Sequence, residues 1–173
     1  MRVVAGAFKG RRLAAPRGAR TRPTADRVRE ALFSMLADVE GVRVLDLYAG
    51  SGALGIEALS RGAASAVFVD DDARAVAAIE RNLEPLGADA TVVQADVERF
   101  LDRAAGAFDL VFCDPPYACA ARLAAPLAER LPVLTSEDAR IVTESDKRNP
   151  LVLPFPLRVE RTYGDTRIAI HER

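Results

Sequence analysis

The chain has 173 residues, of which 50% are hydrophobic and 28% are charged, and its formal net charge is −1. This length is sufficient for one domain with a substantial core, and the composition excludes a disordered or fibrous protein. No apolar run approaches the roughly 18 residues that a membrane-spanning helix needs. The N-terminal residues carry arginines rather than the apolar core of a secretion signal. We therefore expect a cytoplasmic protein that makes no contact with a membrane.

The charge is unevenly distributed along the chain. Residues 1–29 contain nine lysines and arginines and a single acid, Asp26, so this segment carries +8 and the remainder carries −9. A basic segment joined to an acidic body is typical of proteins that bind a polyanion. A solvated terminus without a partner is the alternative. Interspersed apolar residues favour partial order, and we expect a basic arm or hairpin over residues 1–23 that turns near Lys9 and Gly10.

Helices and strands alternate after this arm. The sequence predicts a helix over about residues 25–37, capped by Thr24 and apolar on one face. The C-terminal segments 157–163 and 166–171 are predicted strands joined by a Gly-Asp turn. Between these ends we predict strands over residues 42–48, 66–70, 91–94, 108–113 and 140–144, and helices over residues 52–61, 72–86, 97–104 and 120–130.

This alternation predicts a single α/β domain over residues 24–173. We expect a mostly parallel seven-stranded sheet with helices on both faces and an antiparallel hairpin at the C-terminus. Strands that are buried on both faces should be nearly continuous apolar runs, as residues 42–48 and 108–113 are. Ligands of such sheets bind beyond the carboxyl ends of the strands, where the strand order reverses. Functional side chains are therefore expected at the ends of the first four strands.

The first predicted strand leads into a glycine-rich turn. The sequence Gly50-Ser-Gly52-Ala-Leu-Gly55 matches the pattern G-x-G-x-x-G, and Asp70 follows Gly50 by 20 residues at the end of the next strand. Small residues permit a tight turn and let a ligand approach the backbone, while an acid at the second strand can accept hydrogen bonds from ribose hydroxyls. Any cofactor that contains adenosine could use both features.

A carboxylate at the end of the first strand favours a cationic cofactor. Asp46 lies four residues before Gly50, where it would repel a pyrophosphate but tolerate the ammonium and sulfonium groups of S-adenosylmethionine. Asp96, after the third strand, is suited to recognise an adenine amino group. Helix capping and loop solvation are the alternative roles of these acids. We predict a cofactor site composed of Asp46, Tyr48, Gly50, Ser51, Gly52, Asp70, Asp71 and Asp96.

The fourth predicted strand ends in the sequence Asp114-Pro-Pro-Tyr117. The two prolines stop the strand, hold the preceding residue extended and lack N–H groups, so neighbouring carbonyls stay available as acceptors. The result is a rigid corner that can accept hydrogen bonds from a planar amino group while an aromatic ring stacks on the heterocycle. A turn with a surface tyrosine is the alternative. We predict Asp114, Pro115 and Tyr117 as the catalytic residues.

These motifs resemble those of the class I S-adenosylmethionine-dependent methyltransferases. More closely, they resemble the bacterial 16S ribosomal RNA guanine-N2 methyltransferases of the small subunit. The resemblance implies a Rossmann-like class I methyltransferase fold and methylation of the exocyclic 2-amino group of a guanine in 16S ribosomal RNA. The two N-terminal blocks of this resemblance, residues 2–13 and 21–33, narrow the expected substrate to ribosomal RNA. The resemblance runs nearly end to end, through residues 2–13, 21–33, 45–55, 114–117 and 163–166.

The resemblance also implies roles for single residues. Asp114 and Tyr117 match the catalytic corner, and Asp96 matches the acid beside the adenine. The related pattern often has Glu at the ribose position, where this chain has the shorter Asp70. We expect a monomer that acts on ribosomal RNA, naked or within an assembling small subunit. The residues expected to contact the RNA are Arg11, Arg12, Arg20, Arg22, Thr24 and Arg27.

Three other functions stay open on the sequence alone. The glycine pattern also suits a nucleotide-dependent oxidoreductase, and calorimetry with NAD and S-adenosylhomocysteine would separate the two. The Asp-Pro-Pro-Tyr corner would serve a DNA adenine or other nucleic-acid amino methyltransferase. A non-catalytic RNA-binding protein could keep the fold. Cys113 and Cys119 fit neither a metal-ligand pattern nor a disulfide framework, so we expect no metal site.

Overall fold

The computed structural model describes residues 1–16, 26–36, 38–116 and 119–173, with nothing described for the side chain of residue 121. The strands in this part of the chain are β1 (Arg43–Leu47), β2 (Ser65–Asp70), β3 (Ala90–Gln94), β4 (Phe108–Cys113), β5 (Thr135–Asp146), β6 (Leu157–Tyr163) and β7 (Thr166–Glu172). The helices are α1 (Asp26–Leu36), α2 (Ala53–Ser60), α3 (Ala73–Leu83), α4 (Val97–Arg103) and α5 (Ala120–Leu134).

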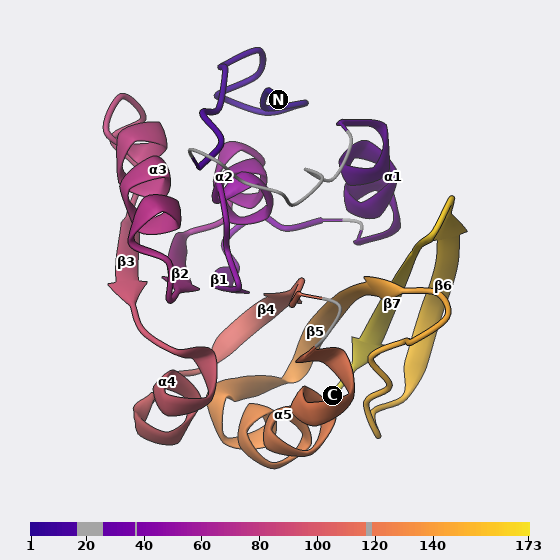
Figure 1. Ribbon diagram of the computed structural model, residues 1–173. Helices are drawn as coiled ribbons and strands as arrows, with labels where there is room; N and C mark the ends of the chain where they lie inside the picture. The colour runs from indigo at the N-terminus through magenta and orange to yellow at the C-terminus, as the bar shows by residue number, and fades with distance from the viewer. Residues whose placement is uncertain (17–25, 37, 117–118) are drawn as a thin grey trace.

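The strands form one seven-stranded sheet in the order β3-β2-β1-β4-β5-β7-β6 (Figure 1). The strands β1 to β5 pair in parallel, whereas β7 runs antiparallel to both β5 and β6. The predicted architecture, a mostly parallel sheet with an antiparallel C-terminal hairpin, is confirmed. The strand order reverses between β1 and β4, so the switch point of the sheet lies there.

Helices cover both faces of the sheet, as predicted. Successive residues of a strand point to opposite faces, and β1 shows this directly. Val44 packs in a core with residues of α1, α2 and α3, whereas Leu45 packs in a second core with residues of α4 and α5. Within the described residues no helix is long and apolar enough to cross a membrane.

The largest departures from the predicted boundaries occur at α5 and β5. The helix α5 continues to Leu134, four residues past its predicted end, and contains Pro126 and Pro132. The strand β5 begins at Thr135, five residues before its predicted start, and its pairing with β4 shifts register between Phe108 and Leu110. Such an irregularity interrupts the period-two pattern on which the sequence prediction depends.

The N-terminal segment, residues 1–16, folds back on itself and lies against α2. Arg2 and Arg12 form an isolated antiparallel bridge, and the N–H of Gly10 donates to the carbonyl of Val3 at 2.9 Å. Gly6 has a φ of +83°, and a Cβ at this position would lie 1.7 Å from the carbonyl oxygen of Ser60. Only glycine therefore permits this close approach of the segment to α2.

Candidate functional site

The predicted cofactor loop and the predicted catalytic corner lie at adjacent strand ends. Asp46 of β1 is in register with Phe112 of β4, and Leu47 is in register with Cys113. Asp114 and Pro115 follow Cys113 directly, so they leave the sheet at the strand end next to that of β1. Tyr117 lies outside the described residues. The described parts of both motifs thus meet at the switch point, where open α/β sheets bind ligands.

The turn after β1 has an unusual backbone conformation. Gly50 and Gly52 have φ values of +57° and +75°, and Tyr48 is a non-glycine residue with a φ of +58°. A side chain in this left-handed region costs about 1–3 kcal/mol of local strain, which often marks a functional site. A Cβ on Gly50 would meet only a carbonyl oxygen at 3.9 Å, whereas a Cβ on Gly55 would lie 2.3 Å from the ring of Phe68. Gly55 therefore serves helix packing, and Gly50 borders open space.

Asp46 is a buried acid whose pKa is shifted by its surroundings. Its side chain accepts a hydrogen bond from the N–H of Gly55 at 2.9 Å, and the residue is 2% exposed. Burial raises the pKa of Asp46 to about 8, against the opposing effect of the Gly55 N–H and with a further contribution from the charge of Asp70. A cation bound nearby would favour the ionised carboxylate.

Asp70 fixes the turn to the neighbouring strand. One of its oxygens accepts a hydrogen bond from the N–H of Gly50 at 2.8 Å, and the other accepts one from the N–H of Asp72 at 3.0 Å. Burial raises the pKa of Asp70, and these two N–H groups act against it. Each carboxylate oxygen can accept a second hydrogen bond, so a ribose hydroxyl remains a suitable partner.

The remaining predicted acids are at or near helix starts. Asp96 accepts a hydrogen bond from the N–H of Arg99 at 3.0 Å and caps α4. Asp72 caps α3 through the N–H of Arg74. Asp71, between Asp70 and Asp72, is exposed. The capping role that the sequence left open for Asp96 is therefore present. An exposed capping carboxylate keeps acceptor capacity for a ligand.

A third carboxylate lies beside the β4 corner, and the sequence prediction missed it. Glu144 of β5 is buried, and it follows Thr143, which is in register with Cys113. Burial raises the pKa of Asp114 well above its usual value, and the charges of Glu144 and Asp46 raise it further. The signal in the sequence was an acid at the end of a predicted strand next to β4.

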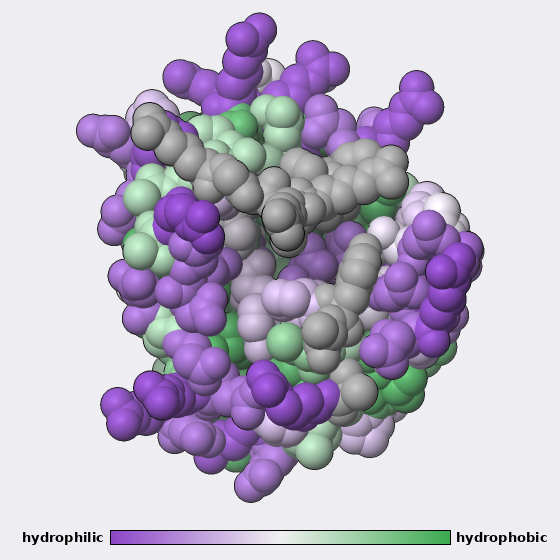
Figure 2. Space-filling model, viewed as in Figure 1, coloured by the Kyte–Doolittle hydropathy of each residue, from purple (hydrophilic) through white to green (hydrophobic). Residues whose placement is uncertain are grey.

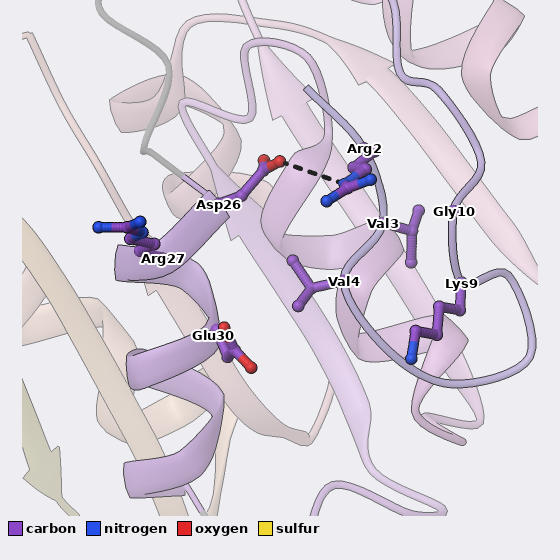
Figure 3. A pocket seen from close by; sticks show the side chains of 8 residues that line it. All are labelled: Arg2, Val3, Val4, Lys9, Gly10, Asp26, Arg27 and Glu30. Atoms are coloured by element: carbon purple, nitrogen blue, oxygen red, sulfur yellow. Dashed lines mark ion pairs between the residues drawn. The ribbon is translucent and has the colours of Figure 1, made fainter.

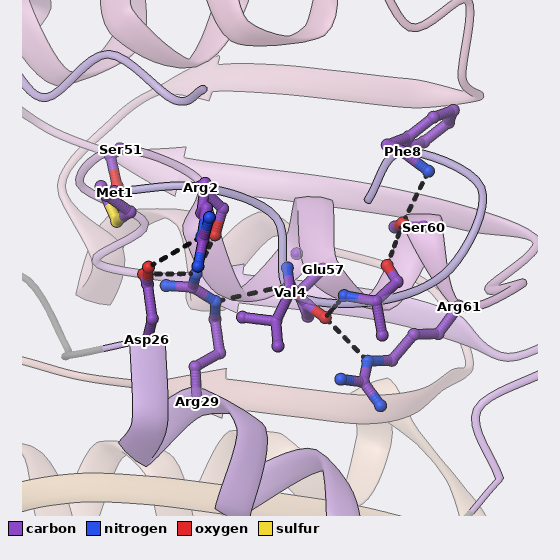
Figure 4. A network of polar contacts seen from close by, with 12 residues as sticks. Met1, Arg2, Val4, Phe8, Asp26, Arg29, Ser51, Glu57, Ser60 and Arg61 are labelled. Carbon is purple, nitrogen blue, oxygen red and sulfur yellow. Dashed lines mark hydrogen bonds and ion pairs between the residues drawn. The ribbon is translucent and has the colours of Figure 1, made fainter. Parts of the chain in front are cut away.

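A second missed residue, Glu57, holds the N-terminal segment (Figure 4). Its carboxylate is fully buried and accepts hydrogen bonds from the N–H groups of Val4 at 2.7 Å and Ala5 at 3.0 Å. It also forms ion pairs with Arg61 at 2.8 Å and with the buried Arg29 at 3.5 Å. Glu57 therefore links α1, α2 and the N-terminal segment, and an acid inside the apolar pattern of a predicted helix was its signal.

Of the predicted RNA-binding residues, Arg11 and Arg12 lie on this segment and Arg27 lies in α1. Arg11, Arg12 and Arg27 are exposed, while Arg20, Arg22 and Thr24 lie outside the described residues. Hydrophilic side chains project around the rim of the face shown in Figure 2. A cavity of about 350 Å³ lies between the N-terminal segment and the start of α1 (Figure 3). Its charged lining consists of Arg2, Lys9, Asp26, Arg27 and Glu30. None of the predicted cofactor or catalytic residues that the structure describes borders it.

Comparison with known proteins identifies the chain. A family model described as "Conserved hypothetical protein 95" matches residues 1–172. The chain belongs to this family. A relative from Escherichia coli strain K12, named ribosomal RNA small subunit methyltransferase D, is 36% identical over 183 residues that cover 100% of this chain and 90% of the relative.

Solved structures share the whole architecture. The Escherichia coli protein yhhF has a TM-score of 0.87 at 33% identity and covers 100% of this chain and 97% of its own. A hypothetical protein of Thermus thermophilus has a TM-score of 0.84 at 34% identity, with coverage of 100% and 99%. The chain has the fold of the class I S-adenosylmethionine-dependent methyltransferases, and its relatives belong to the same class. The methyl donor of this class is S-adenosylmethionine.

Proposed function

We propose that the protein methylates the exocyclic 2-amino group of a guanine in 16S ribosomal RNA. The observation that carries this proposal is the position of Asp114 and Pro115, which follow β4 at the switch point beside Asp46 and the glycine turn. The name of the Escherichia coli relative supports small-subunit ribosomal RNA as the substrate. The name of this relative also favours methyl transfer over the oxidoreductase that the glycine pattern suited.

The residues after β1 and β2 fit a cationic adenosine cofactor. The open space at Gly50 leaves room for a ligand against the backbone, and the buried carboxyl of Asp46 suits a positively charged group. We assign the ribose to Asp70 and the adenine side to Asp71 and Asp96. Tyr48, Ser51 and Gly52 complete the wall of the turn. When bound, S-adenosylmethionine supplies a methyl group on a sulfonium that is already a good leaving group.

Asp114 and Pro115 act on the amino group of the guanine. Its nitrogen is a poor nucleophile because its lone pair is delocalised into the ring. The carboxylate of Asp114 and the carbonyl of Pro115 each accept a hydrogen bond from one N–H of the amino group. These two hydrogen bonds favour a pyramidal nitrogen and stabilise the positive charge that develops on it. Tyr117 stacks on the base, a contact of roughly 1–3 kcal/mol. Alignment of the reactants can lower the barrier by roughly 7–11 kcal/mol through proximity.

The RNA must present an accessible base. A guanine inside a helical stack cannot reach a corner at a strand end, so we expect a single-stranded or loop target, or a base that flips out. The basic segment before α1, together with the start of that helix, holds the RNA backbone through Arg11, Arg12, Arg20, Arg22, Thr24 and Arg27. We expect the protein to act in the cytoplasm, where its substrate is found, and to act as a monomer.

Transfer of a labelled methyl group tests the proposal. Ribosomal RNA and small-subunit particles from a strain that lacks the orthologous enzyme are incubated with the protein and labelled S-adenosylmethionine, and the nucleosides are analysed by mass spectrometry. Label in N2-methylguanosine of 16S ribosomal RNA is expected. Label in N6-methyladenosine would favour the adenine alternative, and no transfer to either substrate would contradict the proposal.

A further inference from the structure

A buried asparagine on α3 joins three distant parts of the chain. Asn82 is 5% exposed, and its side-chain oxygen accepts a hydrogen bond from the N–H of Ala14 at 2.8 Å. Its amino group donates to the carbonyl of Ala14 at 3.0 Å and to the carbonyl of Ser51 at 2.9 Å. Both donors and the acceptor of this amide are therefore used, and the N–H of Ala14 fixes which atom is the oxygen.

The two partners of Asn82 belong to the two binding regions of the protein. Ser51 lies between Gly50 and Gly52 in the cofactor turn, and Ala14 lies three residues before the basic stretch that carries Arg20 and Arg22. A second contact joins the same regions, because the hydroxyl of Ser51 lies 3.8 Å from the sulfur of Met1. The N-terminal segment therefore contacts the cofactor turn directly and also through one shared side chain.

We propose that Asn82 is a positioning residue that couples the N-terminal segment to the cofactor turn, so that RNA and S-adenosylmethionine bind cooperatively. The RNA part rests on the proposed function. A ligand that restrains one region also restrains the other through the shared hydrogen-bonded side chain, so the first ligand bears part of the entropy cost of binding the second. The coupling is reciprocal, so each ligand strengthens the other by the same factor.

The first experiment needs no RNA. Amide hydrogen exchange is measured on the full chain with and without S-adenosylhomocysteine. In the wild type the ligand should slow exchange at Leu13 and Ala14. Asn82→Asp keeps the volume and the acceptor for the Ala14 N–H but loses both donors, so this slowing should disappear. Unchanged slowing in Asn82→Asp, or no slowing in the wild type, would overturn the coupling.

The second experiment measures the coupling with RNA. The dissociation constant of S-adenosylhomocysteine is determined by calorimetry with and without a 16S ribosomal RNA transcript. In the wild type RNA should tighten binding by about 5- to 150-fold, the usual range of coupling between sites. In Asn82→Asp and Asn82→Ala the ratio should fall to about one. Glu80→Ala, an exposed change on the same helix, should keep the wild-type ratio.

The outcomes separate this inference from the proposed function. Wild-type protein that does not bind the transcript contradicts the proposed function, and the exchange experiment then decides the role of Asn82. An Asn82 that only supports packing would lower the melting temperature of the variants and leave the affinity ratio at its wild-type value, which would overturn the inference. Loss of the ratio in both variants, with Glu80→Ala unaffected, supports it.

Discussion

The carboxyl groups of Asp46 and Asp114 lie on adjacent strand ends, away from most of the solvent. Burial dominates the pKa of both, and the charge of Asp46 raises the pKa of Asp114 further. Because the pKa of Asp46 is raised to about 8, a ligand that binds near neutral pH can change the protonation state of this carboxyl group.

Cofactor affinity should depend on the protonation of Asp46. Since its pKa is raised to about 8 and a cation favours the carboxylate, affinity for S-adenosylmethionine should rise as the pH increases from about 6 to about 9. Calorimetry in buffers of different ionisation enthalpy should show proton release on binding near neutral pH. The free protein behaves in the opposite way: its stability should fall as the pH rises from about 4 towards about 8, because the pKa of Asp46 is higher in the folded than in the unfolded chain.

Asp46→Asn keeps an acceptor for the Gly55 N–H and removes the titration. It should abolish both the pH dependence and the proton release, whereas Asp138→Asn at an exposed position of β5 should leave them intact. An affinity that is independent of pH in the wild type would show that the cofactor does not sense Asp46.

Asp114→Asn should separate chemistry from cofactor binding. The amide cannot stabilise the charge on the amino nitrogen as a carboxylate does, so the single-turnover rate should drop by about 10²- to 10⁴-fold. Calorimetry should find the affinity for S-adenosylhomocysteine nearly unchanged. A large loss of that affinity would assign Asp114 to the cofactor site instead.

Glu144→Gln should change the pH dependence of the reaction. Its charge raises the pKa of Asp114, so removing it should lower that pKa and move the ascending limb of the pH–rate profile to lower pH. The profile of kcat/KM over a range of pH measures this shift. If the ascending limb of the profile did not move, the ionisation of Asp114 would not determine its position.

At the scale of elements, α1, α2 and the N-terminal segment depend on one buried charge cluster. Arg29 is fully buried, donates to the carbonyl of Arg2 and pairs with Asp26 at 3.0 Å and with Glu57 at 3.5 Å. A buried pair of this kind adds little net stability compared with apolar packing, but removing one partner leaves an uncompensated charge.

Glu57→Ala should therefore be strongly destabilising. The guanidinium of Arg29 would keep Asp26 and lose its buried partner, and the N–H groups of Val4 and Ala5 would lose their acceptor. We expect a loss of about 3–5 kcal/mol in the free energy of unfolding, measured by urea denaturation. Glu129→Ala, at an exposed position of α5, should change it by much less. A similar effect in both variants would contradict the role of the cluster.

At the scale of the whole molecule, the charge asymmetry predicts the salt dependence of RNA binding. Each phosphate contact of a single strand contributes about 0.7 to the slope of log affinity against log salt concentration. Replacing Arg11 and Arg12 by alanine should weaken binding and reduce this slope. Replacing Arg99 and Arg103 of α4 removes the same charge on the other face of the sheet and should leave the slope unchanged. Equal slopes in both double variants would show that Arg11 and Arg12 do not contact the RNA backbone.

The sequence predicted the order and type of the elements because periodicity and glycine punctuation are local signals. The runs at β1 and β4 are buried on both faces, and their apolar continuity identified them. The ends of α5 and β5 were wrong because helical prolines and a register shift depend on packing against the rest of the fold. The resemblance to a known family, more than periodicity, identified the class of fold.

The sequence also predicted which acids lie at strand ends, but not how they pair. Only the three-dimensional structure shows that Asp70 accepts hydrogen bonds from two backbone N–H groups and that Asp96 caps α4. Glu57, Asn82 and Glu144 were missed because their partners are distant in sequence. Glu57 contacts residues more than 50 positions away, and Asn82 and Ala14 are 68 positions apart. The roles of the predicted site residues stay predictions that the experiments above test.

The anchoring of residues 1–16 has a consequence for biosynthesis. Their docking groups, Glu57, Ser60 and Asn82, are translated more than 50 residues after the segment that they hold. This positively charged stretch of the nascent chain therefore stays undocked until α2 and α3 have emerged from the ribosome.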